Sequence, residues 1–272
     1  MKKNIVLLIT CSLLLIIMSS CVQRDETVNI SSTLSFTASQ NFDSNNDTNS
    51  VDRKKIYLVQ DTRENIISIS LAIPEEVDNE QIYLVETVVK ERINKYSGAT
   101  FDLTLSKEDI SDKSRDYSNY YIVGESRVSY ISDDIVSIVF EIFYNKKGTA
   151  HPLHWFFTVN YNPNTLQLIK FSDKYLVNSQ LYSVFSDLAE NNIMKLHGGH
   201  WPSEWEGFSE MFCSEEEFIE GLINEEEFYA FYTEDGVGIS YPVPHAVGDH
   251  MEVIIPYFNL TEVNQGTAPH LT

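Results

Sequence analysis

The stretch YYIVGESRVSYISDDIVSIVFEIFYNKKGTAHPLHWFFTVNY, residues 120–161, contains three strand-like runs with little chain between them. The runs lie near Tyr120–Tyr130, Ile135–Tyr144 and Leu153–Tyr161, and each is rich in β-branched and aromatic residues. Their connections, ISDD and NKKGTAHP, are short and consist largely of turn residues. Strands joined in this way pair in opposite directions, so the stretch predicts an antiparallel meander.

Regular elements are also predicted on the N-terminal side of the meander and directly after it. Strand patterns occur at residues 54–60 and 66–73, and a further strand-like run, TLQLIKF, follows the meander at residues 165–171. Apolar residues at helical spacing predict a helix over residues 79–96, which would end at Gly98.

The C-terminal third of the chain is predicted to hold two helices and a hairpin. The helices are expected over residues 178–196 and, after a capping box, over residues 214–223. The hairpin would turn at Asp235-Gly236, and a last strand would follow over residues 251–258. Strands and helices are grouped instead of alternating, which predicts an α+β fold with a mainly antiparallel sheet and two or three packed helices.

The N-terminus has the order of a secretory signal. Two lysines precede an apolar run from Ile5 to Met18, and Ser19-Ser20 leads to Cys21. Small residues before a cysteine resemble the lipobox of bacterial lipoproteins, so residues 1–20 are predicted to be removed and Cys21 to be lipidated. The alternative is a retained membrane helix, which needs about 20 apolar residues and therefore a longer run.

The remaining chain divides by composition into a tether, a domain and a tail. Residues 21–52 are rich in Ser, Thr, Asn and Asp without an apolar period, and they predict a lipidated, disordered tether. Such a tether of about 30 residues spans roughly 30 Å. Residues 53–262 have the pattern of a globular domain, and residues 263–272 are expected to be a flexible tail.

The charge of the chain limits its partners. Removal of residues 1–20 takes away two lysines and no acidic residue, which leaves 17 basic and 40 acidic side chains and a net charge of −23. This charge disfavours nucleic acid and anionic lipid, and it favours a cationic protein or peptide or a divalent ion. Solubility alone is the competing explanation.

Cys213 is the one cysteine left after Cys11 is removed and Cys21 is lipidated, so no internal disulfide is expected. Glu210 and Glu215–Glu217 lie close to it in sequence and would raise its thiol pKa. A structural thiol is therefore predicted instead of a nucleophile.

Six of the seven histidines occur in pairs, which raises the question of a metal site. The pairs are His151 with His154, His197 with His200, and His245 with His250. None matches a known metal-binding spacing, and each lies beside the Gly or Pro of a turn, so neither a metal nor another cofactor is predicted. His151 is expected to be a structural turn residue, with His154 and Trp155 at the start of the next strand.

The loop GGHWPSEWEGF brings Trp201 and Trp205 together with Glu204 and Glu206. Tryptophans beside carboxylates are typical of sugar-binding sites, and a glutamate pair could act as acid and base. Packing of the indoles on the domain is the simpler interpretation. The sequence has neither a nucleophile motif nor a Gly-rich phosphate loop.

Three segments resemble a known family: VSYISDDIVSIVFEIFYNKKGTAHP, NYNPNTLQLIKFSDKY and FYAFYTEDGVGISYPVPHAVGDHMEVIIPYFNL. Together they are similar to the extracytoplasmic domain shared by RsiV-type lysozyme-sensing anti-sigma factors and PdaC-type peptidoglycan deacetylases. The matching motifs are a Gly-Ala-His turn around His151, the block from Tyr241 to Gly248, and Ile255-Pro256-Tyr257. Thr149 and His245 depart from the family pattern. The resemblance implies an envelope-facing α+β binding domain without a deacetylase half.

These observations lead to two functional hypotheses. The first is a lipid-anchored, non-enzymatic binding or sensing module on the extracytoplasmic face of the cell envelope, which recognises a cationic protein such as lysozyme or a cell-wall component. Its candidate partner-binding residues are Trp201, Trp205, Tyr241 and His245. The alternative is a cell-wall glycan hydrolase or metal-dependent enzyme that uses the histidine pairs and the tryptophan loop.

Overall fold

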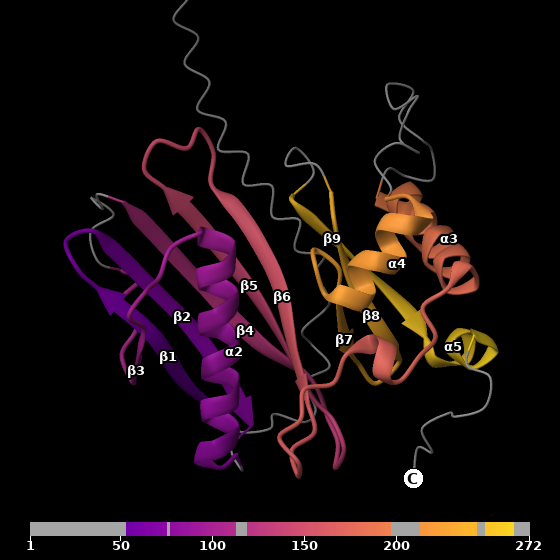
Figure 1. Ribbon diagram of the computed structural model, residues 1–272, viewed down its shortest axis with the longest axis horizontal. Helices are drawn as coiled ribbons and strands as arrows, with labels where there is room; N and C mark the ends of the chain where they lie inside the picture. Colours follow the sequence, from indigo (N-terminus) through magenta and orange to yellow (C-terminus); the bar gives the residue numbers. More distant parts are fainter. Residues whose placement is uncertain (1–52, 75–76, 113–118, 197–212, 244–247, 264–272) are drawn as a thin grey trace, which may run out of the picture. The chain divides into compact units, whose positions relative to one another are not determined.

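The computed structural model describes residues 53–74, 77–112, 119–196, 213–243 and 248–263, and it has the predicted α+β fold (Figure 1). These residues belong to one compact unit, Asn45–Thr272. They form a six-stranded sheet and a three-stranded sheet instead of the single sheet that the sequence predicted.

The six-stranded sheet contains the predicted meander at its centre and edge. Its strand order is β3-β1-β2-β4-β5-β6, and β4, β5 and β6 pair antiparallel in sequence order. The sequence did not predict that β2 pairs parallel to β4, which requires the intervening chain to cross over the sheet. The strands are β1 (Arg53–Asp61), β2 (Asn65–Pro74), β3 (Thr104–Ser106), β4 (Tyr120–Ile131), β5 (Val136–Lys146) and β6 (Leu153–Tyr161).

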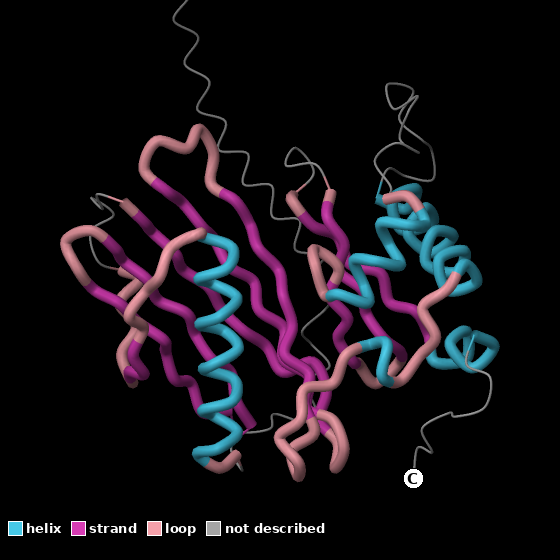
Figure 2. Tube along the Cα trace, viewed as in Figure 1, coloured by secondary structure: helices cyan, strands magenta, loops and turns pink. Residues whose placement is uncertain are grey.

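Helix α2 (Asn79–Ser97) provides this crossover and packs on the six-stranded sheet (Figure 2). Asp78 caps its N-terminus by accepting hydrogen bonds from the amides of Glu80 and Gln81, and Gly98 ends it with a φ of 64°. A left-handed C-cap favours glycine, so both ends follow from local chemistry. The buried face of α2 joins the aliphatic side chains of β2 and β5 in one core.

The fourth strand-like run, residues 165–171, does not form a strand. It makes one isolated bridge, between Tyr161 and Leu168, and then enters the short 3-10 helix η2 (Phe171–Asp173). Leu166 has a φ of 57°, a conformation that interrupts an extended chain.

The three-stranded sheet, in the order β7-β8-β9, packs with the C-terminal helices. Helices α3 and α4 and the β7–β8 hairpin agree with the prediction. The last strand is shorter than predicted, because β9 ends at Pro256 and residues from Tyr257 are helical. Proline has no amide hydrogen to continue a strand ladder. The elements are α3 (Ser179–Leu196), α4 (Glu215–Asn224), β7 (Tyr229–Tyr232), β8 (Gly236–Pro242), β9 (His250–Pro256) and α5 (Tyr257–Val263).

Strand β7 joins the two sheets because both of its faces are buried. Tyr229 and Phe231 pack in the core of the six-stranded sheet, whereas Ala230 and Tyr232 pack in the core of the three-stranded sheet. Successive side chains of a strand point to opposite faces, so four residues can contribute to both cores.

Polar side chains of the six-stranded sheet form hydrogen bonds with the backbone groups of β7 that do not pair with β8. The Ala230 carbonyl accepts from Thr158 Oγ1 at 2.8 Å and from Asn160 Nδ2 at 2.7 Å. The Tyr232 amide donates to Ser137 Oγ at 3.0 Å, and Ser137 Oγ donates to Asn160 Oδ1 at 2.7 Å. We call Ser137, Thr158 and Asn160 the polar seam. It satisfies backbone groups of an edge strand that would be costly to bury unpaired.

Candidate functional site

A cleft of about 690 Å³ lies where the C-terminal end of α2 meets α4 and the loop before β7. We call it the acidic cleft. Its charged residues are Lys95, Glu217, Glu220, Glu226 and Glu227, which give it a net charge of −3. Its aromatic residues are Tyr96, Phe228 and Tyr229.

Two ion pairs fix the two walls of the acidic cleft against each other. Arg92 on α2 donates to the Glu225 carboxylate at 2.9 Å and to its carbonyl at 3.2 Å, and its guanidinium lies 5.3 Å from the Tyr229 ring centroid. Lys95, one turn further along α2, contacts Glu226 at 3.1 Å. Glu225 ends α4 in a left-handed conformation, which turns the chain toward β7.

The carboxylates of the cleft differ in whether they have a hydrogen-bond or ion-pair partner. Glu217 accepts from the backbone amide and hydroxyl of Ser214, and these hydrogen bonds lower its pKa. Glu226 is paired with Lys95. Glu220 and Glu227 are exposed and have no ion pair with any residue that the structure describes. These two carboxylates remain open to a cation.

At the acidic cleft the Tyr96 hydroxyl is buried without a hydrogen bond in the described part of the chain, whereas the buried Tyr229 hydroxyl lies close enough to the Glu227 backbone for a hydrogen bond to affect its pKa. Tyr229 is 3% exposed. Burial raises its pKa, and Arg92 and the backbone of Glu227 oppose this increase. The phenol is therefore neutral and can both donate and accept.

Cys213 lines the same cleft, and the structure agrees with an unreactive thiol. Burial, with a smaller contribution from Glu217, raises its pKa to about 12. A thiol of this kind is protonated at neutral pH, so it is a poor nucleophile.

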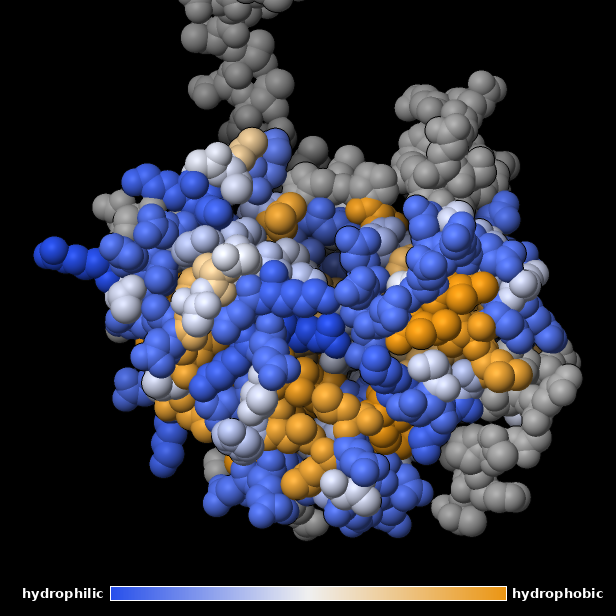
Figure 3. Space-filling model, viewed as in Figure 1, coloured by the Kyte–Doolittle hydropathy of each residue, from blue (hydrophilic) through white to orange (hydrophobic). Residues whose placement is uncertain are grey.

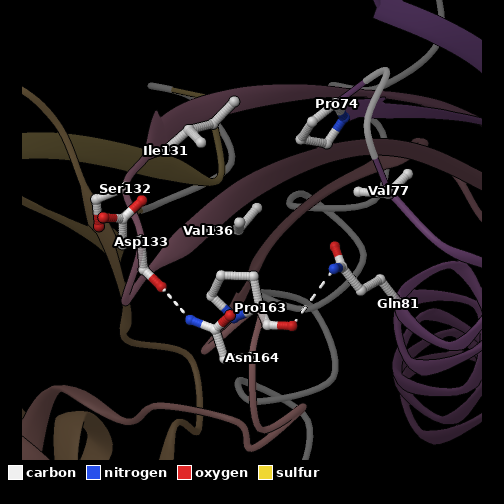
Figure 4. Close-up of a pocket in the computed structure, with 9 residues that line it drawn as sticks. All are labelled: Pro74, Val77, Gln81, Ile131, Ser132, Asp133, Val136, Pro163 and Asn164. Atoms are coloured by element: carbon white, nitrogen blue, oxygen red, sulfur yellow. Dashed lines mark hydrogen bonds between the residues drawn. The ribbon is translucent and has the colours of Figure 1, made fainter.

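A second cleft of about 440 Å³ lies at the N-terminal end of α2 and is shown in Figure 4. Its walls are mixed, with apolar residues such as Pro74 and Val77 beside the polar residues Gln81, Ser132, Asp133 and Asn164. Gln81 bonds across it to the Pro163 carbonyl at 3.4 Å, and Asn164 donates to the Asp133 carbonyl at 2.7 Å. Because these amides are already used, this cleft has fewer groups available for recognition than the acidic cleft.

In Figure 3 hydrophilic residues cover α2 itself, and apolar patches lie beside its lower half and close to α4. Exposed apolar side chains include Leu176, at 51%, and Ile223, at 41%. Of the helices that the structure describes, none has the length and apolar character needed to cross a membrane.

Histidines from separate pairs meet at one end of the two sheets. The Asp249 carboxylate accepts from the His154 backbone amide at 2.8 Å, and His250 follows Asp249 at the start of β9. Burial and the nearby His154 lower the pKa of His250 to about 4, although Asp249 opposes this shift. No group of three or more His, Cys, Asp or Glu residues suited to a metal ion occurs within the described ranges. His151 lies in the exposed turn after Gly148, which has a φ of 91°, and His154 is the second residue of β6, near the strand start that was expected.

One of the predicted partner-binding residues has a different position from the one expected. Tyr241 is 1% exposed and packs edge to face against Phe185 in the core of the three-stranded sheet, so it is a core residue instead of a surface anchor. The pattern of strand β8 explains this, because both of its faces are buried. Trp201, Trp205, His245 and the lipidation candidate Cys21 lie outside the described residues.

The acidic cleft was not predicted from the sequence. The run of acidic residues Glu225–Glu227 directly before the aromatic strand β7 was an available signal. Lys95 and Glu226 are 131 residues apart, however, and only the packing of α2 beside this loop brings Tyr96 into the same site.

A scan against models of known protein families finds no match to this chain, and a search of curated proteins finds none either. Solved structures do match. One is a DUF3298 family protein from Pseudomonas aeruginosa, with 12% sequence identity and a TM-score of 0.47 over 79% of this chain and 94% of that one. Another is a DUF3298 family member from Bacteroides fragilis, with 14% identity and a TM-score of 0.41 over 78% of this chain and 92% of that one.

Proposed function

We propose that this protein is a lipid-anchored, non-enzymatic binding module on the extracytoplasmic face of the cell envelope, and that it captures a cationic protein such as lysozyme. The observation that carries this proposal is the excess of 40 acidic over 17 basic side chains after the predicted removal of residues 1–20. A surface of this charge attracts a basic protein over distances comparable to the Debye length, about 10 Å at 0.1 M salt.

Three further observations support the proposal. The N-terminus resembles a lipoprotein signal that ends at Cys21, followed by a tether that would hold the domain clear of the membrane. The sequence also resembles the extracytoplasmic domain of RsiV-type lysozyme-sensing proteins. Glu220 and Glu227 in the acidic cleft add carboxylates that no described residue neutralises.

The alternative hypothesis, a glycan hydrolase or metal-dependent enzyme, is not supported by any arrangement of the described residues. His154 and His250 come near each other, but the tryptophan loop, on which this hypothesis also depends, lies outside the described ranges. We therefore propose a single function.

Calorimetric titration of the full-length protein in a non-ionic detergent with hen lysozyme tests the proposal. We expect binding that weakens as salt is raised from about 20 to about 300 mM, which shortens the Debye length about fourfold, because exposed charges are screened. A neutral protein of similar size is the control. Absence of lysozyme binding at low salt, or equal binding of the control, would show that the proposal is wrong.

A further inference from the structure

We propose that an exposed apolar strip along helix α4 binds an amphipathic helix of a cationic partner. The apolar strip consists of Leu176, Ile219 and Ile223. The apolar side chains of the partner would pack on the strip, and its basic side chains would lie beside Glu216 and Glu220. This inference rests on the proposed function, because it assigns the surface and the kind of segment through which a cationic protein would be recognised.

Helix α4 has two apolar stripes, and only one of them belongs to the core. Phe218 and Leu222 are buried in the core of the three-stranded sheet. Ile219 packs against this core only in part, and Ile223 is 41% exposed. Residues four apart lie on the same side of a helix, so Ile219 and Ile223 form a second stripe, which reaches solvent.

The chain between η2 and α3 adds a third side chain to this stripe. The charge of Asp173, the last residue of η2, acts on Glu225 at the C-terminal end of α4, and η2 contacts that helix. At the N-terminal end of α4, the Ser179 hydroxyl donates to the Glu215 carboxylate. The intervening chain therefore runs antiparallel along α4, and Leu176 lies midway with 51% exposure. Figure 3 shows apolar residues together close to α4.

Acidic side chains border the apolar strip and decide the sign of its partner. Glu216 and Glu220 are exposed, and they neighbour Ile219 and Ile223 on the surface of the helix. Neither glutamate has an ion pair with any residue that the structure describes. A basic side chain next to an apolar one can therefore contact a carboxylate and the strip together, whereas an acidic segment would be repelled.

The arrangement of the apolar strip favours a helix as its occupant. Ile219 and Ile223 are separated by about 6 Å along the axis of α4, and a helix presents its own apolar side chains at the same interval. Amphipathic helices bind other proteins through apolar residues spaced in this way. Adjacent apolar side chains that are exposed and rimmed by polar residues are typical of interaction sites.

Titration of the full-length protein with three peptides of about 15 residues at low salt tests the assignment, with the detergent solution alone as the blank. The first peptide consists of leucine and lysine, ordered so that all leucines share one face of a helix. The second has the same composition with its leucines spread around the helix, and the third has glutamate in place of lysine. We expect the first peptide to bind at least about tenfold more tightly than the other two. Equal binding of all three, or no binding of the first, would overturn the assignment.

A double variant then tests the apolar strip itself. Leu176→Gln with Ile223→Gln should weaken binding of the first peptide about tenfold, because the apolar area that the complex buries is lost. The matched control is Leu105→Gln with Leu153→Gln, which replaces side chains of 43% and 41% exposure on strands β3 and β6. Thermal unfolding identifies any loss of folding. Equal weakening in the two folded double variants, or none in either, would show that the peptide does not bind the strip.

A second double variant tests the acidic border. Glu216→Gln with Glu220→Gln should weaken binding about threefold at low salt and reduce its dependence on salt. The matched control is Glu64→Gln with Glu234→Gln, which makes the same change of charge at two exposed turns in other parts of the chain. Equal effects of the two changes would contradict the assigned contacts with Glu216 and Glu220.

The two proposals can fail separately. If the wild type binds lysozyme and the Leu176/Ile223 variant binds it equally well, the strip assignment is wrong and the proposed function stands. If the wild type binds the first peptide at the strip but binds neither lysozyme nor any other basic protein, the proposed function is wrong and the strip assignment stands.

Discussion

The two sheets differ in how the backbone groups of their edge strands are hydrogen-bonded. In the six-stranded sheet, β1 and β2 pair over nine positions, and the short strand β3 lies beside β1 at one edge. In the three-stranded sheet, β7 pairs with β8 over only four positions, and side chains of the polar seam bind its other backbone groups. A sheet of three strands is close to the minimum for stability, so the second sheet depends on its contact with the first.

This comparison shows that a few directional bonds can decide how two sheets dock. Apolar packing alone would allow one sheet to shift along the other. The Ala230 carbonyl accepts hydrogen bonds from two side chains, and both can form in only one position of the sheets. The predictions below test this dependence, beginning with the largest expected effect on stability.

Asn160→Leu should lower the free energy of unfolding by about 3 kcal/mol. The substitution removes two buried hydrogen bonds, the one that the Ser137 hydroxyl donates to Asn160 and the one that Asn160 donates to the Ala230 carbonyl. Urea denaturation measures the loss. Hydrogen exchange should also show that amides of β8 and β9 open before those of β4 and β5.

Asn164→Leu is the control for that variant. The Asn164 amide also donates to a carbonyl at 2.7 Å, that of Asp133, but the bond is exposed to solvent. Its loss should therefore be below about 1 kcal/mol. Similar losses in the two variants would contradict the importance of the polar seam.

His250 should make the contact between the sheets sensitive to acid. It lies 4.9 Å from the Phe156 ring, and its pKa of about 4 in the folded protein is below its ordinary value of 6.5. The folded state therefore binds fewer protons than the unfolded state, and stability falls as the pH drops from 6.5 toward 4. The loss from this group reaches about 3 kcal/mol.

His250→Phe removes this titration while it keeps an aromatic ring beside Phe156. Unfolding measured between pH 7 and pH 4 (roughly the interval over which a histidine of this kind titrates) should have a smaller slope in the variant than in the wild type. A proton titration of His250 followed by NMR is the direct check. A measured pKa near 6.5 would contradict the prediction.

The two ion pairs between α2 and the loop before β7 should differ in their effects. Arg92→Met removes the partner of Glu225, whose side chain is 21% exposed and whose pKa is raised by burial even with Arg92 present. We expect a loss of about 2 kcal/mol at neutral pH, because an ionised, half-buried carboxylate then lacks a counterion. Thermal and urea unfolding measure this loss.

Lys95→Met is the matched control, since its pair with Glu226 is more than half exposed on both sides. Pairs of this kind contribute at most about 1 kcal/mol, and salt screens them. A loss as large as that of Arg92→Met would indicate that exposure does not separate the two pairs.

Cys21→Ser should have the smallest effect on folding and the clearest effect on location. Residue 21 is the first residue of the predicted tether and lies outside the domain, so the unfolding transition should be unchanged. Labelling with a fatty acid should disappear, and the protein should leave the membrane fraction or keep its signal. Label retained on the variant would contradict the predicted anchor.

The sequence alone determined most of the local structure. The period of apolar residues, with the caps Gly98 and Ser214, placed the three predicted helices within one or two residues of their observed ends, and Asp235-Gly236 located the hairpin. These signals are local, because they depend on backbone conformation and on which side of an element is apolar. The acidic residues near Cys213 in sequence also predicted an unreactive thiol. In the structure, burial raises the pKa of this thiol more than the nearby acidic residues do.

Only the tertiary structure decided which elements meet. The parallel pairing of β2 with β4, the division into two sheets and the burial of Tyr241 all depend on contacts between distant segments. The acidic cleft has the same origin, since α2 and the loop before β7 are far apart in the chain. Local patterns give each strand its apolar faces but not its neighbour, because packing and hydrogen bonding across the whole domain select the pairing.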